Sequence, residues 1–265
     1  MITGLWTALP NIYRSFDDQE YKRALEFLFA QGIDGLFLLG TTGRGTDFSV
    51  LERMEILEKT IRAIGDPQKI VVAISANAPS DVRHLAQHAG ELGVKGTALT
   101  PPYYGQFSDP EIQEWAQKVF ANFTKKTAIY LYNIPGVTRT TWSLASLDYV
   151  HRIIGVDGIK DSSGDVKTLL GYLDWSARHQ ETSVLAGDEH FTVYNFMMGG
   201  HGIVSGLSTA HPQLLADLVA KAKAKQWEKA IPLQREVNQW LTKLQAYTPR
   251  ETVEVLIRWM KESMQ

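Results

Sequence analysis

The chain has no cysteine among its 265 residues. That absence excludes disulfide bonds, thiolate metal sites and cysteine nucleophiles, and it fits a reducing cytoplasm. An excess of one charge is missing as well, because 27 Lys and Arg face 29 Asp and Glu, a formal net charge of −2. A balanced charge offers no electrostatic footprint for nucleic acid or an anionic membrane. We therefore expect neither as a partner.

Long hydrophobic runs are also missing. Residues 1–6 (MITGLW) show no basic region followed by a long apolar one. We therefore expect no signal peptide and no membrane-spanning helix, and we predict a cytoplasmic protein. No low-complexity tract, long linker or charge block interrupts the chain. The composition, 44% hydrophobic and 21% charged, is that of an ordinary globular protein with a sizeable core.

What the sequence does contain is a regular alternation of short apolar runs and longer amphipathic stretches. The runs are almost continuously apolar, which is typical of parallel strands covered on both faces. Their spacing is that of a βα unit. Eight strands are predicted, at residues 3–8, 35–39, 70–74, 96–100, 128–132, 156–160, 183–186 and 202–205.

Helix-start signals lie between these runs. Ser49 and Glu52 form a capping box before an apolar stretch of helical period. The other predicted starts and helices are Ser80-Asp81 before residues 82–92, Asp109-Pro110 before 112–123, Ser143 before 144–153 and Asp165 before 166–178. Three more helices are predicted at residues 211–223, 227–247 and 249–264.

Eight strands each followed by a helix predict a (β/α)₈ barrel with additional C-terminal helices. We expect the barrel to occupy residues 1–223 and the helical extension, packed on it, residues 224–265. The alternative is an open doubly wound sheet, which usually carries a dinucleotide or phosphate loop. The only candidate, residues 40–45 (GTTGRG), lacks the glycine spacing of such loops.

Lys160 ends the buried run at residues 156–160, and residues 161–165 (DSSGD) follow it as a turn. Burial disfavours an ammonium ion, and a neutral amine attacks carbonyl carbons to form a Schiff base. The competing interpretation is a lysine that reaches out of the strand end and pairs with Asp161 or Asp165.

Other polar groups follow the remaining strands, where barrel enzymes carry their active groups. The turn at residues 40–43 (GTTG) offers amides and hydroxyls to a carboxylate, or is a plain glycine turn. Tyr132 could transfer a proton or be a core residue. Asp188 and Glu189 could bind sugar hydroxyls or cap the next helix. His201 has no second ligand at metal spacing, so no metal site is predicted.

Four motifs carry a family resemblance: residues 40–43 (GTTG), 103–104 (YY), 132–135 (YNIP) and 158–161 (GIKD). Their order and spacing resemble those of the dihydrodipicolinate synthase/N-acetylneuraminate lyase family over nearly the whole chain. The resemblance implies a class I aldolase that forms an imine between pyruvate and Lys160 and needs no other cofactor. It also implies a homodimer or homotetramer in which Tyr104 enters the neighbouring subunit's site.

The resemblance implies a role for each matched residue. Tyr132 would be the general acid/base, Thr41 and Thr42 would bind the pyruvate carboxylate, and the carbonyl of Val204 would face the substrate. The expected catalytic residues are Lys160, Tyr132, Thr41 and Tyr104. The expected substrate-binding residues are Thr42, Gly43, Arg44, Arg139, Gly187, Asp188, Glu189 and Val204.

Departures from the family pattern suggest the second substrate. The synthase branch carries arginine at the position of Val137, where it binds the carboxylate of aspartate semialdehyde, and here Arg139 follows two residues later. Arg44 stands where glutamate is common, and it could hold a substrate acid group or simply pair with a surface acid. Residues 187–189 (GDE) resemble the sugar-binding Asp-Glu of the lyases more than the synthase pattern. From this and from Val137 we predict reversible cleavage of a 2-keto-3-deoxy sugar acid, or a sialic-acid-like substrate, to pyruvate and an aldehyde. The alternatives are the synthase reaction with aspartate semialdehyde and a non-catalytic keto-acid-binding barrel.

Overall fold

The eight predicted strands form a closed parallel barrel, in a computed structural model that describes residues 1–121 and 123–265. Each strand pairs with the next, and β8 closes on β1, where Leu5 lies opposite Ile203. The predicted (β/α)₈ class is therefore confirmed. The strands are β1 Gly4–Ala8, β2 Gly35–Leu38, β3 Ile70–Ala73, β4 Gly96–Leu99, β5 Ala128–Asn133, β6 Gly158–Asp161, β7 Ser183–Ala186 and β8 Gly202–Ser205.

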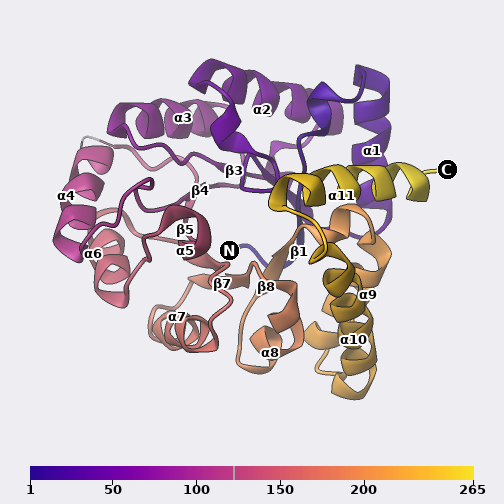
Figure 1. The fold of residues 1–265 in the computed structure, drawn as a ribbon. Coiled ribbons are helices and arrows are strands. Elements are labelled where there is room, and N and C mark those ends of the chain that lie inside the picture. Colours follow the sequence, from indigo (N-terminus) through magenta and orange to yellow (C-terminus); the bar gives the residue numbers. More distant parts are fainter. Residues whose placement is uncertain (122) are drawn as a thin grey trace.

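Helices surround the barrel (Figure 1). They bury apolar residues at helical spacing, as α3 does with Val82, Leu85 and Ala89. Their bounds are α1 Asp18–Ala30, α2 Val50–Ile64, α3 Pro79–Glu91, α4 Asp109–Phe120, α5 Pro135–Thr138, α6 Leu144–Ile154, α7 Val166–Arg178, α8 Thr192–Met197 and α9 Pro212–Lys223. The short helices α5 and α8, in the segments after β5 and β7, were not predicted, and neither was α1, although Asp17 and Glu20 form its capping box.

The helix caps agree with the sequence in part. Ser49 and Glu52 form the predicted capping box of α2, and Ser143 and Asp165 cap α6 and α7. The cap of α4 is Ser108 rather than Asp109, because Glu111 completes a capping box one residue earlier. Helix α3 begins at Pro79 rather than after Ser80-Asp81. The predicted helix 112–123 ends at Phe120, and its residue 122 lies outside the described residues.

The core has two layers, because alternate residues of each strand face opposite sides. One cluster lies between the strands and the helices. The other fills the barrel interior and includes Phe37, Tyr130, Tyr132 and Val204. Ile2 closes the amino end of this interior, where its amide donates to Tyr130 Oη over 2.8 Å.

Two further helices follow the barrel, α10 Trp227–Leu244 and α11 Pro249–Ser263. Helix α10 packs on α9. In Figure 1, α11 begins near the centre of the view and runs outward to the C-terminus. The division into residues 1–223 and 224–265 stays a prediction. No described helix is both long and apolar enough to cross a membrane.

Candidate active site

Lys160 lies in the barrel interior near the carboxyl end of β6. Strand register sets it beside Tyr132 of β5 on one side and Leu185 of β7 on the other. The residue is only 4% exposed. Its Nζ lies 4.1 Å from the ring centroid of Tyr132 and 4.2 Å from that of Phe37. The Lys160 side chain therefore ends against two aromatic rings, inside the barrel mouth.

The acids that could have paired with Lys160 have other partners. Asp161 accepts hydrogen bonds from Asn133 Nδ2 at 2.8 Å and from Ser163 Oγ at 2.9 Å. Asp165 caps α7 by accepting from Thr168 N at 2.9 Å. Burial raises the pKa of the Asp161 carboxyl, and the hydrogen bonds from Asn133 and Ser163 oppose that rise. The geometry thus disfavours a simple strand-end ion pair for Lys160.

Gly187 has no side chain, and the Lys160 side chain occupies the space where a side chain would lie. A Cβ built on Gly187 would lie 2.8 Å from Lys160 Cε and 2.0 Å from Ser162 Oγ. Both distances are too short for an ordinary contact. The glycine after β7 therefore makes room for the side chains of Lys160 and Ser162, at the end of the neighbouring strand.

Tyr132 and Thr41 form a hydroxyl pair beside the lysine. Their Oη and Oγ1 atoms are 3.3 Å apart, and either can donate. Tyr132 is buried and its ring packs edge-on against Phe37. Two hydroxyls in sequence can pass a proton without creating a buried charge.

The turn after β2 carries Thr41 and Thr42 toward the cavity. The amides of Arg44 and Gly45 donate within the turn, to Thr41 O and Gly40 O. A Cβ on Gly43 would lie 2.9 Å from Leu9 O, so the turn packs closely on the end of β1. Consecutive amides in such a turn, with the threonine hydroxyls, suit an anion such as a carboxylate.

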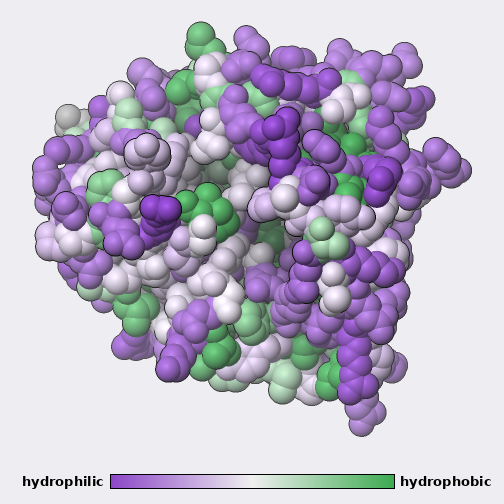
Figure 2. Space-filling model, in the orientation of Figure 1, coloured by the Kyte–Doolittle hydropathy of each residue, from purple (hydrophilic) through white to green (hydrophobic). Residues whose placement is uncertain are grey.

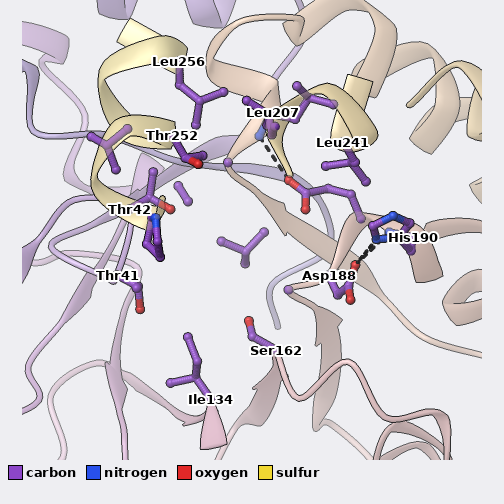
Figure 3. Close-up of a pocket in the computed structure, with 18 of the residues that line it drawn as sticks. Thr41, Thr42, Ile134, Ser162, Asp188, His190, Leu207, Leu241, Thr252 and Leu256 are labelled. Carbon is purple, nitrogen blue, oxygen red and sulfur yellow. Dashed lines mark hydrogen bonds and ion pairs between the residues drawn. The ribbon is translucent and has the colours of Figure 1, made fainter. Parts of the chain in front are cut away.

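These groups line a cavity of about 650 Å³ at the barrel mouth. Figure 2 shows the hollow near the centre of the face, and Figure 3 shows Thr41 and Thr42 on one side of it, opposite Ser162 and Asp188. A smaller cavity of about 140 Å³ lies next to it. Four residues line both: Thr41, Arg44, Tyr132 and Ile134.

Asp188 and Glu189 line the large cavity but already have hydrogen-bond partners. Asp188 caps the 3₁₀ turn Glu189–Phe191 and accepts from the His190 ring at 2.8 Å. Glu189 Oε1 accepts from Ser205 Oγ at 2.9 Å and from Leu207 N at 3.1 Å. Both acids therefore stabilise the loop structure, which leaves fewer acceptors for substrate hydroxyls than the sequence suggested.

The remaining predicted residues divide into two groups. Val204 and Arg44 line the large cavity, as do Gly187 and Thr42. Arg139 is exposed at the C-terminal end of α5 and lines neither cavity. Tyr104 is 94% exposed and also lines neither, and the buried Gly43 lines neither as well. Within one chain, the structure therefore does not bring Arg139 or Tyr104 to the lysine.

Sequence reasoning missed the wall that the C-terminal helices build. Leu241 and Leu244 of α10 and Thr252, Val253 and Leu256 of α11 line the large cavity (Figure 3). They lie more than 80 residues after Lys160 in the chain. No local pattern distinguishes such residues from ordinary helix packing. Ser162 was also missed, although its place just after β6 could have indicated it.

No metal centre is found among the described residues, where no three His, Asp or Glu side chains could together hold an ion. His201 precedes β8, at the amino end of the barrel and away from Lys160. Its Nδ1 accepts from Val184 N at 3.2 Å, and burial lowers its pKa. It is a structural residue of that end.

The fold and the site together define a (β/α)₈ barrel enzyme with a lysine-centred cavity at the carboxyl ends of its strands. The sequence profile of the Dihydrodipicolinate synthetase family matches residues 2–264. The chain belongs to that family, and it is an enzyme of the class I aldolase or carbon–carbon lyase type with a pyruvate-aldolase fold.

Individual relatives agree with this membership. A 4-hydroxy-tetrahydrodipicolinate synthase from Protochlamydia amoebophila is 25% identical over 233 residues, 86% of this chain and 77% of that protein. YagE from E. coli K12, solved with pyruvate, is similar at TM-score 0.89 and 23% identity, covering 98% of this chain and 88% of that one. A 2-keto 3-deoxygluconate aldolase from Picrophilus torridus is similar at TM-score 0.88 and 21% identity, covering 98% and 93%. The two structures show the fold.

Proposed function

We propose that the protein makes or breaks a carbon–carbon bond next to pyruvate through a Schiff base at Lys160. The observation that carries the proposal is the buried amine, which lies over two aromatic rings while the nearby acids are bonded elsewhere. The presence of pyruvate in the structure of YagE supports the same chemistry.

The reaction requires few steps. The Lys160 amine adds to the pyruvate carbonyl carbon, and water leaves to give an imine. The protonated imine withdraws electrons, so the methyl carbon gives up a proton by way of the Tyr132 and Thr41 hydroxyls and the imine becomes an enamine. The enamine carbon attacks an aldehyde, whose oxygen takes a proton by way of Tyr132 and Thr41. Hydrolysis of the imine, or closure of the product on itself, frees the lysine, and the reverse sequence cleaves the same bond.

We propose that the pyruvate carboxylate binds at the turn of residues 40–43. Its threonine hydroxyls and amides lie at the cavity edge, where a small keto acid bound to Lys160 would extend. This assignment leaves the far wall, built by α10 and α11, for the second substrate.

Borohydride reduction tests the proposal directly. With pyruvate present, reduction should fix a pyruvate adduct on the peptide that carries Lys160, as detected by mass spectrometry. Absence of an adduct, or an adduct on another lysine, would contradict the proposal.

For the second substrate, aspartate semialdehyde is the leading proposal. The Protochlamydia amoebophila relative is named for this synthase reaction. The cavity geometry agrees, because Asp188 and Glu189 each use one carboxylate oxygen in the loops, which halves the number of carboxylate oxygens that they offer to a sugar. The prediction of a 2-keto-3-deoxy sugar acid is therefore the second candidate, which Val137 favours because it puts an apolar side chain where the synthase branch has its carboxylate-binding arginine.

Side-by-side kinetics separate these candidates. We expect a higher kcat/KM for pyruvate plus aspartate semialdehyde than for cleavage of a 2-keto-3-deoxy sugar acid. The opposite preference would restore the sugar acid as the substrate.

We also propose that the protein works as a homo-oligomer in which Tyr104 completes a neighbouring site. Tyr104 is 94% exposed and has a positive φ of 82°, so the loop holds a large aromatic side chain outward. Aromatic residues are enriched at protein interfaces. Sedimentation at assay concentration should show at least a dimer, and a fully active monomer would contradict the proposal.

A further inference from the structure

Arg44 stands where the two cavities meet. It lines both of them together with Thr41 and Tyr132, whose hydroxyls are 3.3 Å apart. In the proposed reaction the aldehyde oxygen approaches this hydroxyl pair. The rest of the aldehyde then extends into one cavity or the other, and Arg44 borders both routes.

The backbone at Arg44 is unusual for an arginine. Its φ of 51° and ψ of 42° place it in the left-handed region. That conformation costs an ordinary L-residue about 1–2 kcal/mol, and glycine adopts it freely. Strained residues of this kind cluster at functional sites. The same conformation recurs at Arg139, which lines neither cavity, so it is the left-handed backbone together with the place at both cavities that points to a use for the Arg44 side chain.

The charges around the cavities single out the same residue. Among the described residues that line them, the Lys and Arg side chains are Lys160, Arg44 and Arg250. Lys160 is taken up by the imine. The Arg250 side chain is 75% exposed and lies 3.8 Å from Glu254. The Arg44 side chain is only 33% exposed and is paired with Asp47.

An ion pair with Asp47 does not use up the guanidinium. Arginine carries five N–H donors, and the pair with Asp47 is made through the Nη2 atom. The other donors can grip a second carboxylate by two hydrogen bonds, which is the geometry arginine favours. Asp47 holds the guanidinium in position while a substrate binds the free edge.

We infer that Arg44 binds the carboxylate of the second substrate, so that the aldehyde is an acid. The inference rests on the proposed Schiff-base function and assigns its acceptor specificity. It moves the recognising cation from the segment after β5, where Val137 stands and Arg139 is exposed, to the turn after β2.

Two matched variants test the inference. Arg44→Asn removes the cation but suits the left-handed backbone, because asparagine tolerates it. Arg139→Asn is the same change at a second left-handed arginine, with φ 60°, which lines neither cavity. Each variant is assayed with pyruvate and either aspartate semialdehyde or glyceraldehyde, an aldehyde without a carboxylate.

We expect Arg44→Asn to lower kcat/KM for the acidic aldehyde roughly 10- to 100-fold, the range of a charge-assisted hydrogen bond. The neutral aldehyde should change less than about twofold on the same grounds, and Arg139→Asn should leave both values near wild type. Arg44→Lys keeps the positive charge but cannot make two parallel hydrogen bonds to a carboxylate. Its kcat/KM for the acidic aldehyde should therefore lie between those of the wild type and Arg44→Asn.

Three results would overturn the inference. Arg44→Asn could impair both aldehydes equally, Arg139→Asn alone could impair the acidic one, or the wild type could show no preference for the acid. Pyruvate trapping at Lys160 is measured in the same preparations. Intact trapping with any of these results leaves the proposed function standing, whereas absent trapping in the wild type removes both.

Discussion

Two tyrosines on one strand show how the ends of the barrel differ. Tyr130 and Tyr132 both lie on β5, both are at most 3% exposed, and both point into the barrel interior. Tyr130 Oη accepts from Ile2 N at 2.8 Å and shares a hydrogen bond with Ser183 Oγ at 3.0 Å. Tyr132 Oη has a 3.3 Å contact with Thr41 Oγ1 and faces a cavity.

The difference teaches that strand position, rather than residue type, decides the use of a buried hydroxyl. At the amino end, N-terminal residues fill the interior and the hydroxyl has two short partners. At the carboxyl end, the loops and C-terminal helices leave space, and the hydroxyl keeps a loose partner beside an amine. A tightly bonded group stabilises the fold, and a loosely bonded one is available for proton transfer.

The largest effect is expected for Lys160, whose amine lies at the carboxyl end of the barrel. Lys160→Ala should abolish turnover and pyruvate trapping, because no other described lysine lines the cavity. Circular dichroism should show that the variant stays folded. A pyruvate adduct retained in this variant would mean that another lysine forms the imine, so the carboxyl end of the barrel would not hold the reactive amine.

Tyr132→Phe should lower kcat by roughly 10²–10⁴-fold, the usual contribution of a positioned proton donor. Imine formation should persist, as seen by borohydride trapping. An unchanged kcat would make Tyr132 a packing residue like its neighbour.

The matched control is Tyr130→Phe, the same change two residues earlier. It should keep kcat within about twofold while lowering the free energy of unfolding by roughly 1–3 kcal/mol, because buried partners lose their hydrogen bonds. Urea denaturation measures the latter. A large loss of activity in this control would erase the contrast between the two ends.

Gly187→Ala should lower kcat roughly 10- to 100-fold, because the added Cβ would lie 2.0 Å from Ser162 Oγ and 2.8 Å from Lys160 Cε, so both side chains must move, and small misplacements of reacting groups are costly. The control is Gly171→Ala in α7, where a Cβ would meet nothing closer than 3.6 Å. That variant should keep full activity and gain up to about 1 kcal/mol of stability from helix propensity. Equal activities of the two variants would count against the role of Gly187.

The smallest effect concerns high pH. Burial raises the pKa of Tyr130 from 10.0 to about 12. The folded state therefore keeps this proton between pH 10 and 12 while the unfolded state loses it, so stability falls as the pH rises through that window. The shift corresponds to roughly 2–3 kcal/mol.

Tyr130→Phe should show a shallower loss of unfolding free energy between pH 10 and 12 than the wild type, measured by urea denaturation. If the unfolding free energies of the two proteins fell equally steeply with pH, the amino end of the barrel would not hold Tyr130 in its neutral form.

Much of the fold could be predicted from the sequence because its signals are local. Apolar runs such as residues 70–74 and the capping box of Ser49 and Glu52 depend on residues a few positions apart. Errors fall where two local signals compete. Ser108 and Asp109 are both good N-caps, and Glu111, three residues after Ser108, decided between them.

The candidate site could be predicted only in part. Lys160, Tyr132 and Thr41 were found because strand ends meet at one edge of a barrel. Asp188 and Glu189 were expected to bind substrate, and the structure shows that both already hold the loops around β7 and β8. Hydrogen bonds between distant loops have no signal in a single sequence.

The sequence by itself determined the barrel, its lysine and the hydroxyl groups near it, because period and spacing encode which residues end each strand. The tertiary structure alone decided which of these side chains share a cavity. It placed Arg44 at the cavity and Arg139 outside it, although both arginines follow strands and both have left-handed backbones. It also brought Leu256 of α11 over the mouth, because a side chain's neighbours depend on how distant segments pack rather than on the residues beside it in the chain.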